Sequence, residues 1–163
     1  MLINRIKARV RHHLAALLVC MVASAMTITT SATTHQSCSK DLGSFTQVLI
    51  SGIAVDAEVA DESAEIRRGL MNRQSLAKDA GMLFIYPKAR VLRFWMKNTY
   101  IPLDIAFADK KGRIVKIRSM EPESTRMIDS KVPAKYALEM NQGWYKTNGI
   151  NVGDTIECRS PAS

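Results

Sequence analysis

Lys97 and Asp104 are the two side chains of this sequence that we expect to take part in binding or catalysis. They flank a polar turn, Asn98–Thr99, within a stretch of aromatic and aliphatic residues that covers positions 94–107. An ammonium and a carboxylate that meet in apolar surroundings can form a structural ion pair or line a ligand pocket, and a lysine with a lowered pKa can also act as a base. All three roles require the two side chains to lie close together.

Two predicted strands, residues 91–97 and 103–108, must position this pair. In both stretches apolar side chains alternate with others, which is the period-two pattern of an extended strand. The turn residues between the strands, together with Pro102, which cannot donate to a ladder, predict a loop at the junction. We therefore predict a strand–turn–strand unit with Lys97 and Asp104 facing each other at its mouth, beside Trp95.

The beginning of the chain has the three-part layout of a secretory signal peptide. Four basic residues and no acid precede an apolar run at positions 14–22, and small residues follow it. Ala25 and Ala32 each end a small-x-small triplet that fits a cleavage site. The apolar run is shorter than the roughly 20 residues that a membrane-spanning helix needs, although an uncleaved anchor is the alternative. We predict residues 1–32 as a cleaved signal peptide and expect an exported protein, periplasmic or extracellular, with no integral membrane span after cleavage.

Removal of the leader changes the charge balance. The whole chain carries 23 basic and 15 acidic residues, a net charge of +8. Without the four basic residues of the leader, 19 basic residues remain against 15 acidic ones, a net charge of +4. No long basic run is interleaved with aromatic residues, so we predict no nucleic-acid partner.

The cysteines support the same compartment. Cys20 leaves with the leader, and Cys38 and Cys158 remain near the two ends of the mature chain. An even pair in an oxidising compartment predicts a disulfide, and domain termini often lie close together. Two independent thiols are the alternative.

The rest of the chain alternates short strands with turns. We predict residues 33–44 as a linker, residues 45–158 as a single domain and residues 159–163 as a tail. Two short helices are expected, one opening at Asp61 and ending at Gly69, the other capped by Asn141 and ending at Gly149. The remaining strands are predicted at residues 45–50, 53–59, 82–86, 113–118, 136–140 and 155–158. This pattern predicts an α+β fold, mainly antiparallel, with a partly closed β-barrel and two short helices.

Several motifs together resemble one family. They are Arg68-Gly69-Leu70-Met71, Gly81-Met82-Leu83-Phe84, Phe94-Trp95-Met96-Lys97-Asn98-Thr99, Ile101-Pro102-Leu103-Asp104-Ile105-Ala106-Phe107, Leu138-Glu139, and Gly149-Ile150 with Gly153-Asp154. The chain resembles the domain-of-unknown-function 192 family over roughly residues 45–156, nearly all of the predicted mature chain. The resemblance implies a small β-rich domain, often exported, without an established biochemical role. The motif residues carry over to Arg68, Met71, Met82, Trp95, Lys97, Asn98, Asp104 and Glu139.

Residue types exclude several classes of enzyme. His12 and His13 leave with the leader and His35 lies in the predicted linker, so histidine-based hydrolase triads and zinc sites lack their parts. The segment 121–131 has no cysteine, which some members of the family carry there, so the resemblance gives no support for a metal or redox role of that loop. Methionine sulfur can hold Cu(I), but Met82, Met96 and Met140 fall at core positions of strands, so we predict that they fill the core. We expect no metal and no cofactor.

The sequence thus predicts an exported module that binds a small ligand, anionic or hydroxylated, or serves as an accessory protein. The predicted binding residues are Arg68, Trp95, Lys97, Asn98, Asp104 and Glu139, with Trp95 as an apolar wall. One alternative is a histidine-free enzyme that uses Lys97, Asp104 and Glu139 as acid–base groups. The other is a structural or interaction protein of the cell envelope.

Overall fold

The structure is a computed structural model that describes Cys38 and residues 45–159. These residues all belong to one compact unit, Thr34–Ser163, and the other unit, Met1–Thr33, lies outside the described residues. The predicted leader and its cleavage site therefore lie outside the described part of the chain, as does the predicted linker except for Cys38.

Nine strands and two short helices follow one another along the described chain. The strands are β1 (Phe45–Ile50), β2 (Ile53–Ala60), β3 (Ala80–Arg90), β4 (Arg93–Phe94), β5 (Leu103–Ala108), β6 (Ile114–Met120), β7 (Ile128–Asp129), β8 (Ala134–Asn141) and β9 (Ile156–Arg159). The helices are α1 (Ser63–Arg68) and α2 (Trp144–Thr147).

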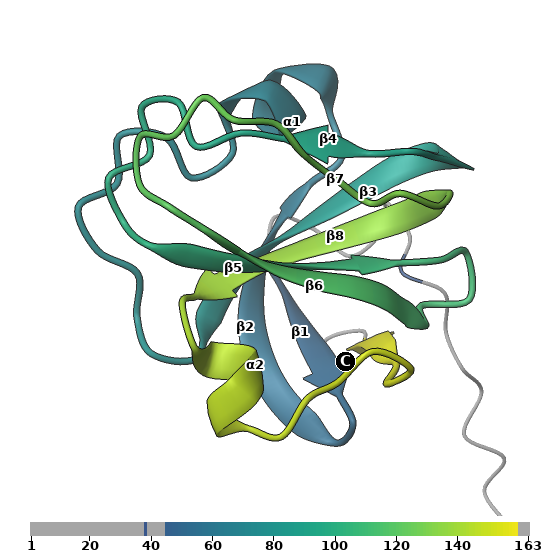
Figure 1. Ribbon diagram of the computed structural model, residues 1–163. Helices are drawn as coiled ribbons and strands as arrows, with labels where there is room; N and C mark the ends of the chain where they lie inside the picture. The colour runs from purple at the N-terminus through teal and green to yellow at the C-terminus, as the bar shows by residue number, and fades with distance from the viewer. Residues whose placement is uncertain (1–37, 39–44, 160–163) are drawn as a thin grey trace, which may run out of the picture. The chain divides into compact units, whose positions relative to one another are not determined.

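Seven of these strands form one sheet in the order β6-β5-β8-β3-β2-β1-β9, and β4 and β7 form a separate ribbon. Strands β2 and β3 pair parallel, whereas the other neighbours pair antiparallel. A parallel pair needs a crossover, and the connection from β2 to β3 contains α1. Figure 1 shows α1 near the β4–β7 ribbon and away from α2.

The fold class differs from the prediction in two respects. The domain is mainly β and not α+β, because α1 has six residues and α2 has four. The large sheet curls into a half-barrel (Figure 1) and does not close. Its two edges meet near the isolated bridge between Arg113 and Thr155, ahead of β6 and β9. In the described chain, no ladder joins β6 to β9.

Apolar side chains cover both faces of the sheet. In β5, Ile105 and Phe107 contribute to one hydrophobic cluster, which we call the pocket-side core, and it also contains Phe84 and Leu70. The intervening Ala106 belongs to the other cluster, the disulfide-side core, which holds both cysteines. Because successive side chains of a strand point to opposite faces, every residue of β5 is buried on one side or the other.

The predicted strand at residues 91–97 is the main error. Only Arg93 and Phe94 are extended, and they pair with β7. After Phe94 the chain leaves the ladder, and the amide of Met96 donates to the carbonyl of Ser124 at 2.8 Å. The partners of β5 are β6 and β8, so the predicted hairpin between residues 91–97 and 103–108 does not form.

Most other elements lie where they were predicted, with small shifts of their ends. Helix α2 begins after Gly143, not Asn141. The side-chain amide of Asn141 instead donates to the carbonyls of Leu76 and Ala77, at 3.2 and 2.9 Å, and so joins β8 to the loop that precedes β3.

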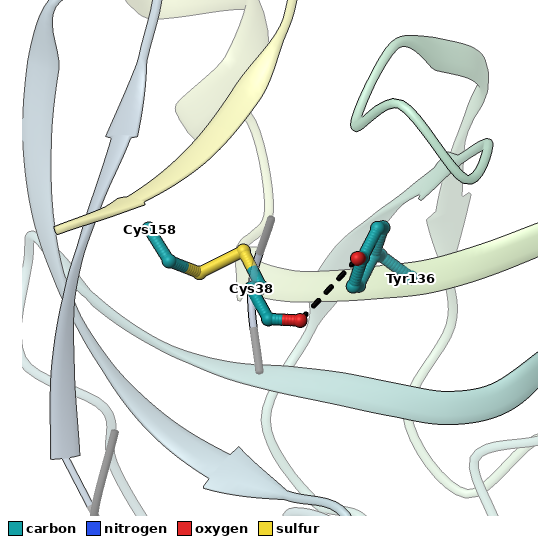
Figure 2. Close-up of a disulfide and its surroundings, with 3 residues drawn as sticks. All are labelled: Cys38, Tyr136 and Cys158. Atoms are coloured by element: carbon teal, nitrogen blue, oxygen red, sulfur yellow. Dashed lines mark hydrogen bonds between the residues drawn. A yellow bond between two sulfur atoms is a disulfide. The ribbon is translucent and has the colours of Figure 1, made fainter. Parts of the chain in front are cut away.

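The predicted disulfide is present. Cys38 and Cys158 are bonded across a sequence separation of 120 residues, and both are buried. In Figure 2 the hydroxyl of Tyr136 points at the backbone carbonyl of Cys38, to which it donates at 3.3 Å. Cys38, assigned by the sequence to a linker, is therefore fixed to the end of the sheet.

Two further observations concern side chains and membrane spans. Met82, Met96 and Met140 are buried in the two cores, as predicted. Neither helix of the described chain has the length and apolarity needed to cross a bilayer.

Candidate functional site

A cavity of about 350 Å³ opens between α1, β3, β4 and β8. We call it the α1 pocket. Its lining combines arginines, aromatic rings and one carboxyl group: Ile66, Arg67, Arg68, Gly69, Leu70, Met71, Phe84, Tyr86, Arg93, Phe94, Trp95, Thr99 and Glu139.

Glu139 is the buried carboxyl group of this pocket. It lies in β8, opposite Met82 of β3 and Ile105 of β5, and its residue exposure is 5%. Burial among apolar neighbours disfavours the charged form and raises the pKa of Glu139 to about 8. Within the described residues its carboxyl has no hydrogen-bond or ion-pair partner. The group is therefore mainly a neutral acid at pH 7, and it can donate a hydrogen bond into the pocket.

Arginines contribute the positive charge of the lining. Arg67 and Arg68 end α1, and Arg93 lies in β4, all three exposed. The helix that carries two of them starts with a capping box between Glu62 and Glu65. It ends at Gly69, whose φ of +49° suits glycine, and a Cβ there would lie 3.4 Å from the ring of Phe84. Gly69 thus lets the chain pass close over the aromatic wall.

Aromatic rings build the wall. Phe84 and Phe94 meet edge to face, with ring centroids 4.9 Å apart, and Phe94 meets Phe107 in the same way at 5.7 Å. Trp95 remains 43% exposed, and the ammonium of Lys97 lies 5.5 Å from the centroid of its ring. An exposed indole beside a cavity is a ready apolar contact for a ligand.

Tyr86 stands at one end of this wall. Its pKa is raised, mainly by burial and also by the neighbouring Glu139, while the nearby Arg90 lowers it. The phenol therefore stays protonated at neutral pH and can donate a hydrogen bond.

The structure brings together three of the six predicted binding residues, Arg68, Trp95 and Glu139, in the α1 pocket. Lys97 does not line it and contacts it through the indole of Trp95. Asn98 has a turn role, because its φ is +56° and its carbonyl accepts from the amide of Asn72 at 2.8 Å.

Asp104 lies on the other face of the sheet. One of its carboxylate oxygens accepts from the amide of Gly143 at 2.8 Å, and the other, which is buried, has no partner. It borders a different depression, together with Tyr145 and Lys146. Asp104 shares its face with Ala106 of the disulfide-side core, whereas Glu139 faces the pocket-side core together with Ile105.

The predicted convergence of Lys97 and Asp104 is therefore wrong. No ion pair joins them in the described chain, and Asp104 is separated from Trp95 by the sheet. The acid–base set of Lys97, Asp104 and Glu139 is likewise not assembled, because its two carboxyl groups lie on opposite faces.

Several residues of the α1 pocket are not predicted by the sequence. Arg67 adjoins a predicted site residue, and Arg93 shares a predicted strand face with Trp95, so both carried a weak signal. Phe84 and Tyr86 carried none, because their apolar run reads as core. Among the described residues there is no group of three or more His, Cys, Asp or Glu side chains that could hold a metal ion.

Two solved structures resemble this domain. One is the crystal structure of a candidate transcription regulator from Sinorhizobium meliloti 1021, with 38% identity and a TM-score of 0.67 over 70% of this chain and 93% of that chain. The other is a protein of unknown function from Novosphingobium aromaticivorans DSM 12444, with 33% identity and a TM-score of 0.66 over 69% of this chain and 84% of that one.

No curated protein matches the chain. A family model described as "Uncharacterized ACR", DUF192, matches residues 46–158, which include every strand that builds the α1 pocket. The chain therefore belongs to the domain-of-unknown-function 192 family.

Proposed function

We propose that this protein is an exported binding module whose α1 pocket takes the acid group and the adjoining apolar or hydroxylated part of a small ligand. The observation that carries the proposal is the joint lining of one cavity by Arg68, Trp95 and the buried Glu139. An acid group would lie against the arginines, and the body of the ligand would pack on the aromatic wall.

The electrostatics of the pocket favour an anion. Arg67, Arg68 and Arg93 have no ion-pair partner among the described residues, so their charges are available to a ligand. Glu139 adds little negative charge at neutral pH because its pKa is about 8. Guanidinium groups bind carboxylates in bidentate geometry, which gives direction as well as charge.

Glu139 supplies selectivity in this proposal. A neutral carboxyl at the wall of an apolar cavity both donates and accepts a hydrogen bond. A ligand with a hydroxyl or carbonyl group that reaches Glu139 satisfies this buried group, and a ligand without one leaves it unpaired.

Binding is favoured over catalysis by the composition of the lining. Glu139 is the one carboxyl group among the described residues of the α1 pocket, and no lysine or histidine lines it. The Sinorhizobium protein is described as a candidate transcription regulator. In this chain α1 has six residues and α2 has four, which is short for a recognition helix in a major groove.

Isothermal titration with a panel of small organic acids tests the ligand class. We expect saturable binding by at least one acid that carries an apolar or hydroxylated body, and weaker binding by its uncharged amide. Arg68→Gln should lower the affinity about tenfold, which corresponds to roughly 1.4 kcal/mol.

The matched control is Arg118→Gln, which removes an equally exposed arginine that lines other depressions. Equal losses in both variants would point to unspecific charge attraction and would contradict the proposal, as would a panel without any binder.

Export rests on the layout of the first 32 residues and is consistent with the disulfide. Fractionation of cells that express the full chain, followed by intact-mass measurement, tests it. A protein in the cytoplasm that still begins at Met1 would reject this part of the proposal.

A further inference from the structure

A second cavity, of about 450 Å³, adjoins the α1 pocket. The two cavities have three lining residues in common, Ile66, Arg67 and Tyr86, so they lie side by side, and we call the two together the groove. The second cavity extends along α1 and the far end of β3. Its other lining residues are Asp61, Glu62, Ser63, Pro87, Lys88 and Arg90.

Positive charge recurs in the second cavity. Lys88 and Arg90 line it but do not line the α1 pocket, whereas Arg68 and Arg93 line the α1 pocket alone. Arg67 lines both. A single acid group held by Arg68 and Arg93 therefore leaves Lys88 and Arg90 without an anion.

Lys88 and Arg90 lie at the irregular end of β3. The strand pairs with β8 in regular register as far as Ile85, and the register then shifts before Arg90. The exposed residues 87–90 thus lie within or at the end of this shift, just beyond Tyr86, which lines both cavities.

Arg90 has hydrogen-bond donors left for a ligand. Its guanidinium lies 5.0 Å from the centroid of the Tyr86 ring, and no carboxylate of the described chain forms an ion pair with it. A cation held on an aromatic face keeps its donors for another partner. The acids of this cavity, Asp61 and Glu62, lie at the start of α1, and Glu62 belongs to the capping box.

We propose that the groove takes an elongated small molecule with two acid groups, one bound by Arg68 and Arg93 in the α1 pocket and the other by Lys88 and Arg90. The spacer between the acid groups passes Ile66 and Tyr86. This inference rests on the proposed function, since it assigns the ligand class of the same site.

The test compares matched probes by isothermal titration. Each probe pair is a linear α,ω-dicarboxylic acid and its own half-amide, which differ only in one charge. Over a series of chain lengths, we expect the diacid to bind about tenfold more tightly than the half-amide once the spacer is long enough to reach both positive regions.

Two double variants test whether Lys88 and Arg90 cause the preference for the diacid. Lys88→Gln with Arg90→Gln should make the diacid and the half-amide bind equally, without loss of half-amide affinity. Lys110→Gln with Lys111→Gln, in the exposed turn between β5 and β6, removes the same charge elsewhere and should leave the preference unchanged.

Each result is decisive. Equal affinities of diacid and half-amide for the natural protein at every length would overturn the two-acid inference while leaving the proposed function intact. If both double variants lose the preference equally, general charge attraction explains it, and the inference is overturned as well. If neither probe binds and no other acid does, the proposed function itself fails.

Discussion

Asp104 and Glu139 are the two buried carboxyl groups of the described chain, and they lie on opposite faces of the same sheet. Glu139 stands opposite Ile105 in the β5–β8 ladder, one residue along from Asp104. One residue along a strand reverses the face, so these neighbours belong to different surroundings. Asp104 accepts a hydrogen bond from the amide of Gly143 at the start of α2, and Glu139 faces the α1 pocket.

Glu139 should make folding stability depend on pH. Its pKa rises from the ordinary value of 4.5 to about 8 on folding, so the folded protein keeps a proton that the unfolded chain loses above pH 4.5. Stability is therefore expected to fall as the pH rises from about 4.5 to 8. Glu139→Gln should remove this slope and gain on the order of a few kcal/mol relative to the natural protein near pH 8.

Urea unfolding of both proteins between pH 4 and pH 9 measures this effect, with Asp56→Asn, an exposed carboxylate on β2, as the control. A stability difference between Glu139→Gln and the natural protein that stays constant over this range would show that Glu139 is not a buried neutral acid.

Asp104 should matter for stability and not for the pocket. Asp104→Ala leaves the amide of Gly143 without its acceptor, which should cost about 1–3 kcal/mol of unfolding free energy. Asp104→Asn keeps an oxygen acceptor and should cost less. Both variants should bind ligand with unchanged affinity, and titration of the folded variants checks this. Reduced affinity in Asp104→Asn would mean that the two faces are coupled.

Trp95 should matter for binding and not for stability. Its side chain is 43% exposed, so Trp95→Ala is expected to change the unfolding free energy by less than about 0.5 kcal/mol. Loss of the indole wall should weaken ligand binding about tenfold. Tyr100→Ala is the matched control, because Tyr100 is 42% exposed and does not line the pocket. If both variants bind alike, the ligand does not pack on the indole.

The disulfide should contribute strongly to stability. It closes a loop with a sequence separation of 120 residues, and loss of such a link costs roughly 4–5 kcal/mol on the chain-entropy model. Urea unfolding of Cys38→Ala with Cys158→Ala, compared with the natural protein with and without reductant, measures the cost. The folded double variant should bind ligand normally, since the cysteines belong to the disulfide-side core. A natural protein equally stable with and without reductant would contradict this prediction.

The sequence predicts a strand correctly wherever the apolar alternation of a segment coincides with its pairing in the sheet. The apolar alternation of residues 103–108 alone predicts a strand, and β5 has the same bounds. Residues 91–97 alternate equally well, but only Arg93 and Phe94 are paired, because the amide of Met96 bonds to Ser124 in a distant loop. The alternation pattern of residues 91–97 cannot show this, because the hydrogen bond of Met96 is made to a residue some thirty positions away.

The site was half predictable for a related reason. Arg68, Trp95 and Glu139 were named from motif positions, and they share the pocket. Asp104 was placed beside Lys97 through an assumed hairpin, whereas its true partner is Gly143, 39 residues further along. Pairing of β5 with β8 decides that contact, and the order of strands in a sheet is not encoded in the period of any one strand.

The link between Cys38 and Cys158 also determines how the domain would carry a mechanical load. The Cα atoms of the two cysteines are 5.0 Å apart, and strands β1 to β8 lie between them in sequence. Tension applied to the chain outside the two cysteines would run through the sulfur–sulfur bond and bypass the ladders of the sheet. The groove along α1 would then keep its shape under a pull that could unzip the reduced domain.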